Sequence, residues 1–90
     1  MEEMIVAQVS PIGLEQTVYI VSNNSEEVPI MKTVTIEELP SVVAMSAAKY
    51  KIDYVKIAGP KPYSEGVRDI ITEKISTCFG KDNKFTIELI

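Results

Sequence analysis

The segment from Lys49 to Ser64, KYKIDYVKIAGPKPYS, constrains the fold of this chain more than any other stretch. A helix is predicted to end near Tyr50, and a short apolar strand follows from about Tyr54 to Ala58. A Gly-Pro-Lys-Pro turn then leads into a second helix. A strand between two helices is the middle of a right-handed βαβ unit. The segment therefore predicts a sheet in which helices connect parallel strands.

Three short segments ahead of this unit are predicted to be strands. They are Met4–Val9, Thr17–Ser22 and Val28–Val34, and turn-forming or polar residues separate them. Pro29 has no backbone N–H group, so its strand is expected at an edge of the sheet. Consecutive strands with short connections tend to pair with one another, which predicts an antiparallel meander.

The first helix has two alternative starts. Thr35-Ile36-Glu37-Glu38 matches a capping box, with Thr35 as the N-cap and Glu38 returning to its backbone. Pro40 favours a later start, because proline fits the first helical turn. With either start, the helix has an apolar face at helical spacing, formed by Val42, Val43, Ala47 and Tyr50, with Leu39 in the lead-in.

The second helix has the clearest periodicity in the chain. Ser64 is the expected N-cap and Gly80 the expected C′ residue. Cys78 is expected to behave as a small buried apolar residue. The predicted apolar stripe consists of Val67, Ile70, Ile71, Ile75, Cys78 and Phe79.

A final half-buried strand is predicted where Phe85, Ile87 and Leu89 alternate with polar residues. The element order is then βββαβαβ, an α/β fold in a single domain of residues 1–90. If both crossovers are right-handed, the five-stranded mixed sheet has the order 3-2-1-4-5, and both helices cover the same face.

The other face of this sheet has no helix to cover it. Its expected side chains from the last two strands are Tyr54, Lys56, Thr86 and Glu88. Tyr19 is a further interface candidate, since tyrosine buries a large area while keeping a polar tip. We expect a partly exposed sheet face that a second subunit or another protein covers.

The passage from Tyr50 to Pro60, YKIDYVKIAGP, resembles the helix end and fourth strand of RuvC- and YqgF-type domains, which have the ribonuclease H-like fold. The start from Ile5 to Gly13, IVAQVSPIG, is similar to their first strand and its Gly-rich turn. In topology the resemblance covers most of the chain, and it implies a nuclease-like architecture.

The same resemblance implies that the catalytic centre is missing. Those nucleases place an Asp in the first strand and an acidic residue near the end of the fourth, and this pair holds Mg²⁺ or Mn²⁺. Here the first position offers Gln8 and Ser10, and the second offers Ala58 and Gly59. The helix that usually brings the last metal ligands is also absent. We expect a shortened domain that is not an enzyme and holds no metal or cofactor.

Composition excludes several other classes of protein. The net charge is -4, with 9 basic residues scattered among 13 acidic ones and no histidine, which argues against nonspecific nucleic-acid binding. The single cysteine excludes a disulfide within the chain and a CxxC-type zinc site. With no signal peptide or membrane span in the sequence, the cytoplasm is the expected location.

A candidate ligand loop follows the fourth predicted strand and comprises Gly59, Lys61, Tyr63 and Ser64. Ligands of α/β sheets bind at such strand ends, and Lys61 with free N–H groups of the next helix could hold an anion. In the alternative interpretation the loop is only stiff, and its prolines fix the direction of the chain. Two prolines also remove donors, which makes it a poor phosphate cradle.

Asp69 and Glu73 are four residues apart on the second helix, opposite its apolar stripe. Paired carboxylates can perform acid–base catalysis. With Arg68 and Lys74 beside them, they are expected to form a solvated helix face.

Three functional hypotheses follow. The first is a non-enzymatic interaction or accessory domain that forms a homodimer through its open sheet face or the edge strand Val28–Val34, or binds another protein. The second is a non-cleaving nucleic-acid-binding protein. It would use the lysines near the central strand, Lys49, Lys51, Lys56 and Lys61. The third is a residual enzyme that uses the Gly59–Ser64 loop.

Overall fold

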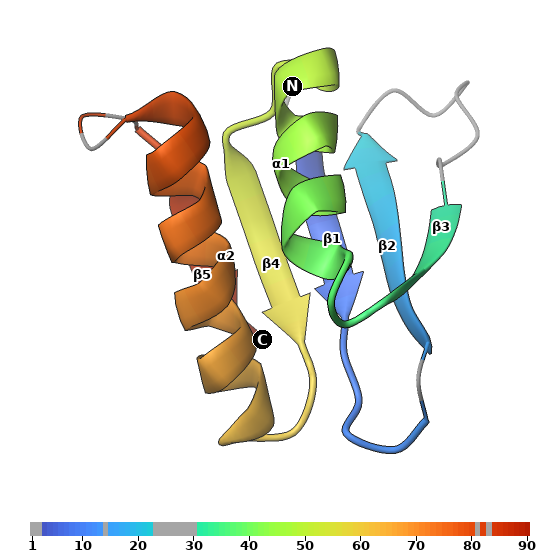
Figure 1. The fold of residues 1–90 in the computed structure, drawn as a ribbon. Helices are drawn as coiled ribbons and strands as arrows, with labels where there is room; N and C mark the ends of the chain where they lie inside the picture. Colours follow the sequence, from blue (N-terminus) through green and yellow to red (C-terminus); the bar gives the residue numbers. More distant parts are fainter. Residues whose placement is uncertain (1–2, 14, 23–30, 81, 83) are drawn as a thin grey trace.

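The structure, a computed structural model, describes residues 3–13, 15–22, 31–80, 82 and 84–90. Seven elements follow in the predicted order (Figure 1). They are β1 (Glu3–Gln8), β2 (Glu15–Ser22), β3 (Met31–Thr35), α1 (Leu39–Tyr50), β4 (Tyr54–Ala58), α2 (Tyr63–Phe79) and β5 (Thr86–Leu89).

The strand order β3-β2-β1-β4-β5 confirms the predicted sheet. β1 pairs antiparallel with β2 and parallel with β4, while β5 extends the parallel part beyond β4. β3 lies at one edge, as predicted for the third strand. Pro29 and the predicted first half of that strand, residues 28–30, lie outside the described residues.

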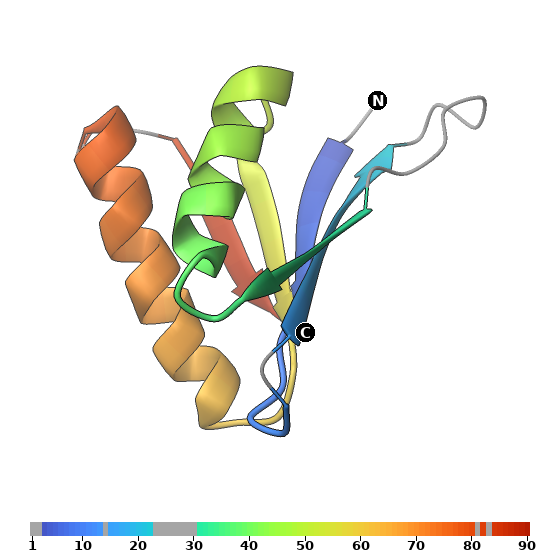
Figure 2. The same ribbon diagram turned by 45° about the vertical axis from the view of Figure 1, so that its right-hand side comes forward.

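Both helices lie on the same side of the sheet, as the handedness rule predicts (Figure 2). Their apolar faces and one face of the sheet form the hydrophobic core. Side chains alternate along a strand, so β4 sends Val55 and Ile57 into this core and Tyr54 and Lys56 to the opposite face. None of the helices in the described residues is long and apolar enough to cross a membrane.

Both predicted start signals of α1, the capping box and Pro40, are present in the structure, but they have different roles. The helix begins at Leu39 with Pro40 in its first turn. Thr35 and Glu38 do form reciprocal hydrogen bonds, with the Glu38 N–H donating to Thr35 Oγ1 (3.3 Å) and the Thr35 N–H to Glu38 Oε1 (3.4 Å). These bonds close a turn between β3 and the helix, so Thr35 is not the N-cap of α1. The missing N–H of Pro40 explains the later start.

The predictions for α2 need two corrections. Ser64 is not the N-cap, because Pro62 occupies that position and Ser64 lies inside the first turn with 1% of its surface exposed. Cys78 is exposed rather than buried, because the last turn of α2 borders a surface pocket between the helices. The interior stripe is narrower than predicted. Its buried members are Val67, Ile71 and Ile75, whereas Ile70 (53%) and Phe79 (38%) are exposed.

Gly80 ends α2, as its C-cap and not as the predicted C′ residue, with a φ of 87° and its N–H donating to the Ser76 carbonyl at 2.9 Å. Phe79 contacts Phe85 with ring centroids 5.1 Å apart, and Phe85 in turn packs against the core. Phe85, Ile87 and Leu89 pack against the core as the alternation predicts.

Candidate functional site

The helix-free face of the sheet brings together all five side chains predicted for an interface. Residues paired directly across neighbouring strands point to the same side of a sheet. Tyr54 pairs with Thr86 and Lys56 with Glu88, and Val6 lies between Lys56 on one side and Tyr19 on the other. We call this set the open face: Val6, Tyr19, Tyr54, Lys56, Thr86 and Glu88.

Polar contacts connect the side chains on the β4–β5 side of the open face. The Tyr54 hydroxyl donates to Glu88 Oε2 at 2.7 Å, and the Lys56 ammonium lies 5.7 Å from the centroid of the Tyr54 ring. Both contacts involve a charged group, which strengthens a hydrogen bond or an aromatic contact. The three side chains therefore form one connected group that spans two strands.

The β1–β2 side of the open face is more apolar, and sequence reasoning missed its central residue. Val6 is 4% exposed although no helix covers it. Its register neighbours, Tyr19 and Lys56, have long side chains that can shield it, and Gln8 Nε2 donates to the Tyr19 hydroxyl at 3.4 Å. Because β1 is apolar on both faces, alternation alone could not show which of its residues face the helices.

The candidate ligand loop begins with a close packing contact. Gly59 follows β4 directly, and a Cβ atom there would lie 2.6 Å from the Val9 carbonyl oxygen and 2.7 Å from Val9 Cγ2. The Val9 N–H also donates to the Ala58 carbonyl at 2.8 Å. Glycine is therefore required here by the close approach of two strand ends.

The rest of this loop does not converge on a common point. Lys61 is exposed, while Tyr63 packs against the hydrophobic core. The Ser64 hydroxyl oxygen is buried, and no described residue serves as its hydrogen-bond partner. A hydroxyl without solvent access cannot contact a ligand held by Lys61. A ligand role for this loop remains a prediction without geometric support.

The two positions that carry metal-binding carboxylates in the resembled nucleases are neighbours in this structure. Gln8 at the end of β1 is directly paired with Ala58 at the end of β4. An amide and a methyl group thus stand where two carboxylates would be needed for a hard cation. Within the described ranges, no group of three potential metal-ligating side chains occurs.

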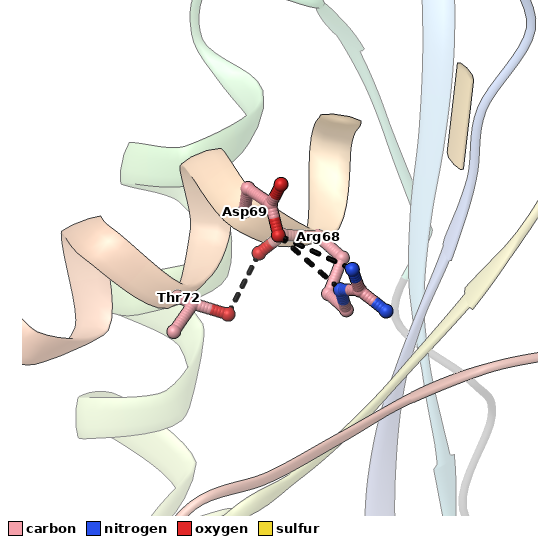
Figure 3. Close-up of polar contacts among 3 residues, drawn as sticks. All are labelled: Arg68, Asp69 and Thr72. Atoms are coloured by element: carbon pink, nitrogen blue, oxygen red, sulfur yellow. Dashed lines mark hydrogen bonds and ion pairs between the residues drawn. The ribbon is translucent and has the colours of Figure 1, made fainter. Parts of the chain in front are cut away.

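The acidic residues of α2 form the expected solvated helix face. Asp69 is exposed and pairs with its neighbour Arg68, whose Nη2 lies 3.3 Å from Asp69 Oδ1 (Figure 3). Thr72 Oγ1 donates to the Arg68 carbonyl at 2.7 Å. Glu73 is likewise exposed. Such a surface ion pair contributes about 0–1 kcal/mol, and it forms no pocket for acid–base catalysis.

The four lysines of the nucleic-acid hypothesis do not share a surface. Lys49 and Lys51 lie at the end of α1 that precedes β4, and Lys61 follows the opposite end of β4. Lys56 projects from the open face, away from both helices. Nucleic-acid binding remains a prediction that no contiguous group of these lysines supports.

These features define an α/β domain with the ribonuclease H-like fold, in the form that actin-like proteins also use. No protein-family profile and no curated protein sequence matches the chain. Among the solved structures that share the fold are two of a phosphatase. One is the type II variant of the Ppx/GppA phosphatase from Aquifex aeolicus, with a TM-score of 0.58 and 9% identity over 100% of this chain. The other is a second structure of the Aquifex aeolicus PPX-GPPA enzyme, with a TM-score of 0.53 and 9% identity over 99% of this chain.

This chain spans 36% of the length of either phosphatase chain. At 9% identity the likeness establishes the fold and nothing about activity. The resemblance noted in the sequence is thus correct at the level of the ribonuclease H-like fold, and its finer assignment to RuvC or YqgF is not shown.

Proposed function

We propose that this protein is a small non-enzymatic interaction domain that associates with a second copy of itself through the open face. The proposal rests on one observation, which is that helices cover only one face of the sheet. Both helices lie on one face, and the other presents Tyr19 and Tyr54 beside the nearly buried Val6. Tyrosines around an apolar centre are typical of protein interfaces.

The open face supports self-association better than the edge strand does. β3 is five residues long, and its described side chains include exposed Lys32 and Thr33. Short edge strands with a lysine resist pairing with another chain. The open face instead carries Lys56 and Glu88, whose opposite charges can pair across a two-fold axis.

The pairing of Gln8 with Ala58 supports the non-enzymatic part of the proposal. Neither Gln8 nor Ala58 has a carboxylate that could hold the divalent cation required for hydrolysis in the resembled nucleases.

Sedimentation velocity over a range of protein concentrations tests the proposal. We expect a monomer–dimer equilibrium that Tyr54→Glu and Lys56→Glu each weaken by about tenfold, because central interface residues dominate affinity. Lys74→Glu is the matched control, since it makes the same charge change on α2, on the other side of the sheet. A wild-type chain that stays monomeric at about 1 mM contradicts the proposal, as does equal weakening by Lys74→Glu.

A further inference from the structure

The outer side of α1 has fewer charged side chains than a solvent-exposed helix normally has, and Lys49 is the one charged residue between Leu39 and Tyr50. No acidic residue occurs between Leu39 and Tyr50. Ser41, Met45 and Ala48 recur at helical spacing away from the core, and the Met45 side chain is 70% exposed. A surface helix usually has charged residues on this side. An exposed methionine between two small residues is instead suited to a contact surface, since methionine adapts to many partners.

A hollow lies on each side of the row formed by Ser41, Met45 and Ala48. The first, of about 670 Å³, lies between α1 and β3 and is lined in part by Lys32, Lys49 and Tyr50. The second, of about 340 Å³, lies between α1 and α2 and is lined in part by Lys74 and Cys78. Met45 and Ala48 line both hollows, so the two form one continuous surface. We call it the α1 surface: Ser41, Met45, Ala48, Lys32, Lys49 and Lys74.

The charge of the α1 surface is opposite to that of the whole chain. Its three lysines come from β3, α1 and α2, and the described residues that line the hollows include no aspartate or glutamate. Among the described residues an ion pair joins Arg68 and Asp69, and none of these three lysines forms an ion pair with a described carboxylate. Yet the net charge of the chain is -4. A local positive rim around apolar hollows on an acidic protein selects for a negatively charged partner with an apolar face.

We infer that the α1 surface binds an acidic amphipathic helix of a partner protein. Apolar side chains of such a helix, spaced by one turn, would enter the two hollows on either side of Met45. Its flanking carboxylates would meet Lys32, Lys49 and Lys74.

A second copy of this chain does not fit the α1 surface. α1 contains no acidic residue, and the apolar stripe of α2, Val67, Ile71 and Ile75, is buried in the core. On its exposed side α2 presents Ile70 beside Asp69 and Glu73, but no second exposed apolar side chain lies one turn away, so neither α1 nor α2 has an apolar stripe flanked by acidic residues on its exposed side. A nucleic acid fits poorly as well, because apolar surface separates the three lysines.

An amide NMR titration of the full chain tests this inference. The probe is a synthetic peptide of about 18 residues, five helical turns, with leucines at i, i+3, i+4 and i+7 spacing and glutamates elsewhere. We expect shifts concentrated at Ser41, Met45, Ala48 and Lys74, and weaker binding as salt is added. Met45→Glu should weaken binding at least tenfold, and Lys74→Glu about threefold to tenfold. Neither residue is buried in the core, so both variants should fold.

Three controls separate this surface from others. Ile12→Glu, at an isoleucine that is 86% exposed in the turn after β1, should leave binding unchanged. A peptide with lysines in place of the glutamates should not bind. Lys56→Glu should weaken self-association through the open face and leave peptide binding intact, so this inference and the proposed function can fail separately.

Absence of shifts at about 1 mM peptide overturns the inference, as does equal binding of the lysine peptide. Shifts at the same positions with vesicles of anionic lipid or with single-stranded DNA, and none with the acidic peptide, also overturn it and assign the α1 surface to that other ligand.

Discussion

The side chain of Gln16 replaces a missing strand partner for the backbone of Ser10. Gln16 Oε1 accepts the Ser10 N–H at 2.6 Å, and Gln16 Nε2 donates to the Ser10 carbonyl at 3.1 Å. Gln16 is 2% exposed and belongs to β2, while Ser10 lies just beyond the end of β1. Both backbone groups are thereby satisfied where the ladder between the two strands has ended, as a part-buried backbone requires.

Gln16→Leu should therefore lower the free energy of unfolding by about 1–3 kcal/mol. The substitution leaves two backbone groups of Ser10 without partners, and an unsatisfied buried group carries its full desolvation cost. Urea unfolding measures the change. Gln8→Leu, at an exposed position on the neighbouring strand, is the control and should stay within about 0.5 kcal/mol of the wild type. If both substitutions lowered the free energy of unfolding by the same amount, the hydrogen bonds between Gln16 and Ser10 would provide no specific stabilisation.

The contact of Gly59 with Val9 predicts that Gly59→Ala is destabilising by about 1–3 kcal/mol, because an added methyl group would overlap a backbone carbonyl. Gly66→Ala is a matched substitution inside α2, where a Cβ atom meets nothing within 4 Å. It should stabilise the protein by about 0.5–1 kcal/mol, since alanine favours the helix and restricts the unfolded chain. Thermal unfolding should show a lower melting temperature than the wild type for Gly59→Ala and a higher one for Gly66→Ala. A Gly59→Ala protein as stable as the wild type would refute the packing argument.

The buried hydroxyl of Ser64 predicts an unusual result for Ser64→Ala. The oxygen has no hydrogen-bond partner among the described residues, so its removal should leave stability unchanged or raise it by up to about 1 kcal/mol. Thr35→Ala provides the contrast, because the Thr35 hydroxyl donates to Glu38 Oε1 at 2.9 Å. This variant should lose about 0.5–1 kcal/mol. A loss above about 1 kcal/mol for Ser64→Ala, by urea unfolding, would instead indicate that an ordered water binds the hydroxyl.

Two adjacent isoleucines on α2 should respond differently to truncation. Ile71 is fully buried and Ile70 is 53% exposed. Ile71→Ala should cost about 2–5 kcal/mol, through lost burial and the cavity left behind. Ile70→Ala should change stability by less than about 1 kcal/mol, as lost contacts are offset by better helix propensity. Chemical denaturation compares the pair, and similar losses would mean that a further contact buries Ile70 in solution.

The fold could be predicted from the sequence because its local signals agree with one another. The alternation Val55, Lys56, Ile57 assigned both faces of β4, and the spacing of Val67, Ile71 and Ile75 set the buried side of α2. Together with the right-handedness of the two crossovers, these periodicities predict a single strand order. The same alternation placed Tyr54 and Lys56 correctly on the helix-free face.

The misassigned residues lie where several elements meet. Serine is a favoured N-cap residue, but α2 already begins at Tyr63. Ser64 therefore lies inside the first turn, with its hydroxyl buried. Cys78 continues the apolar stripe of α2 but faces a hollow beside α1 instead of the sheet. Helical periodicity describes the direction of a side chain around its own axis, and it contains no information about whether a neighbour is present there.

What the sequence determined by itself is the set of elements, their order and the one face that each amphipathic strand or helix buries. These follow from hydrophobic periodicity and from the handedness of L-amino acids, which act over a few residues. Only the tertiary structure decided that Val6 lies on the open face, that Gln8 meets Ala58, and that three lysines from three elements surround Met45. Such relationships depend on strand register and on the distance between packed elements, and both are set by the packing of the whole core.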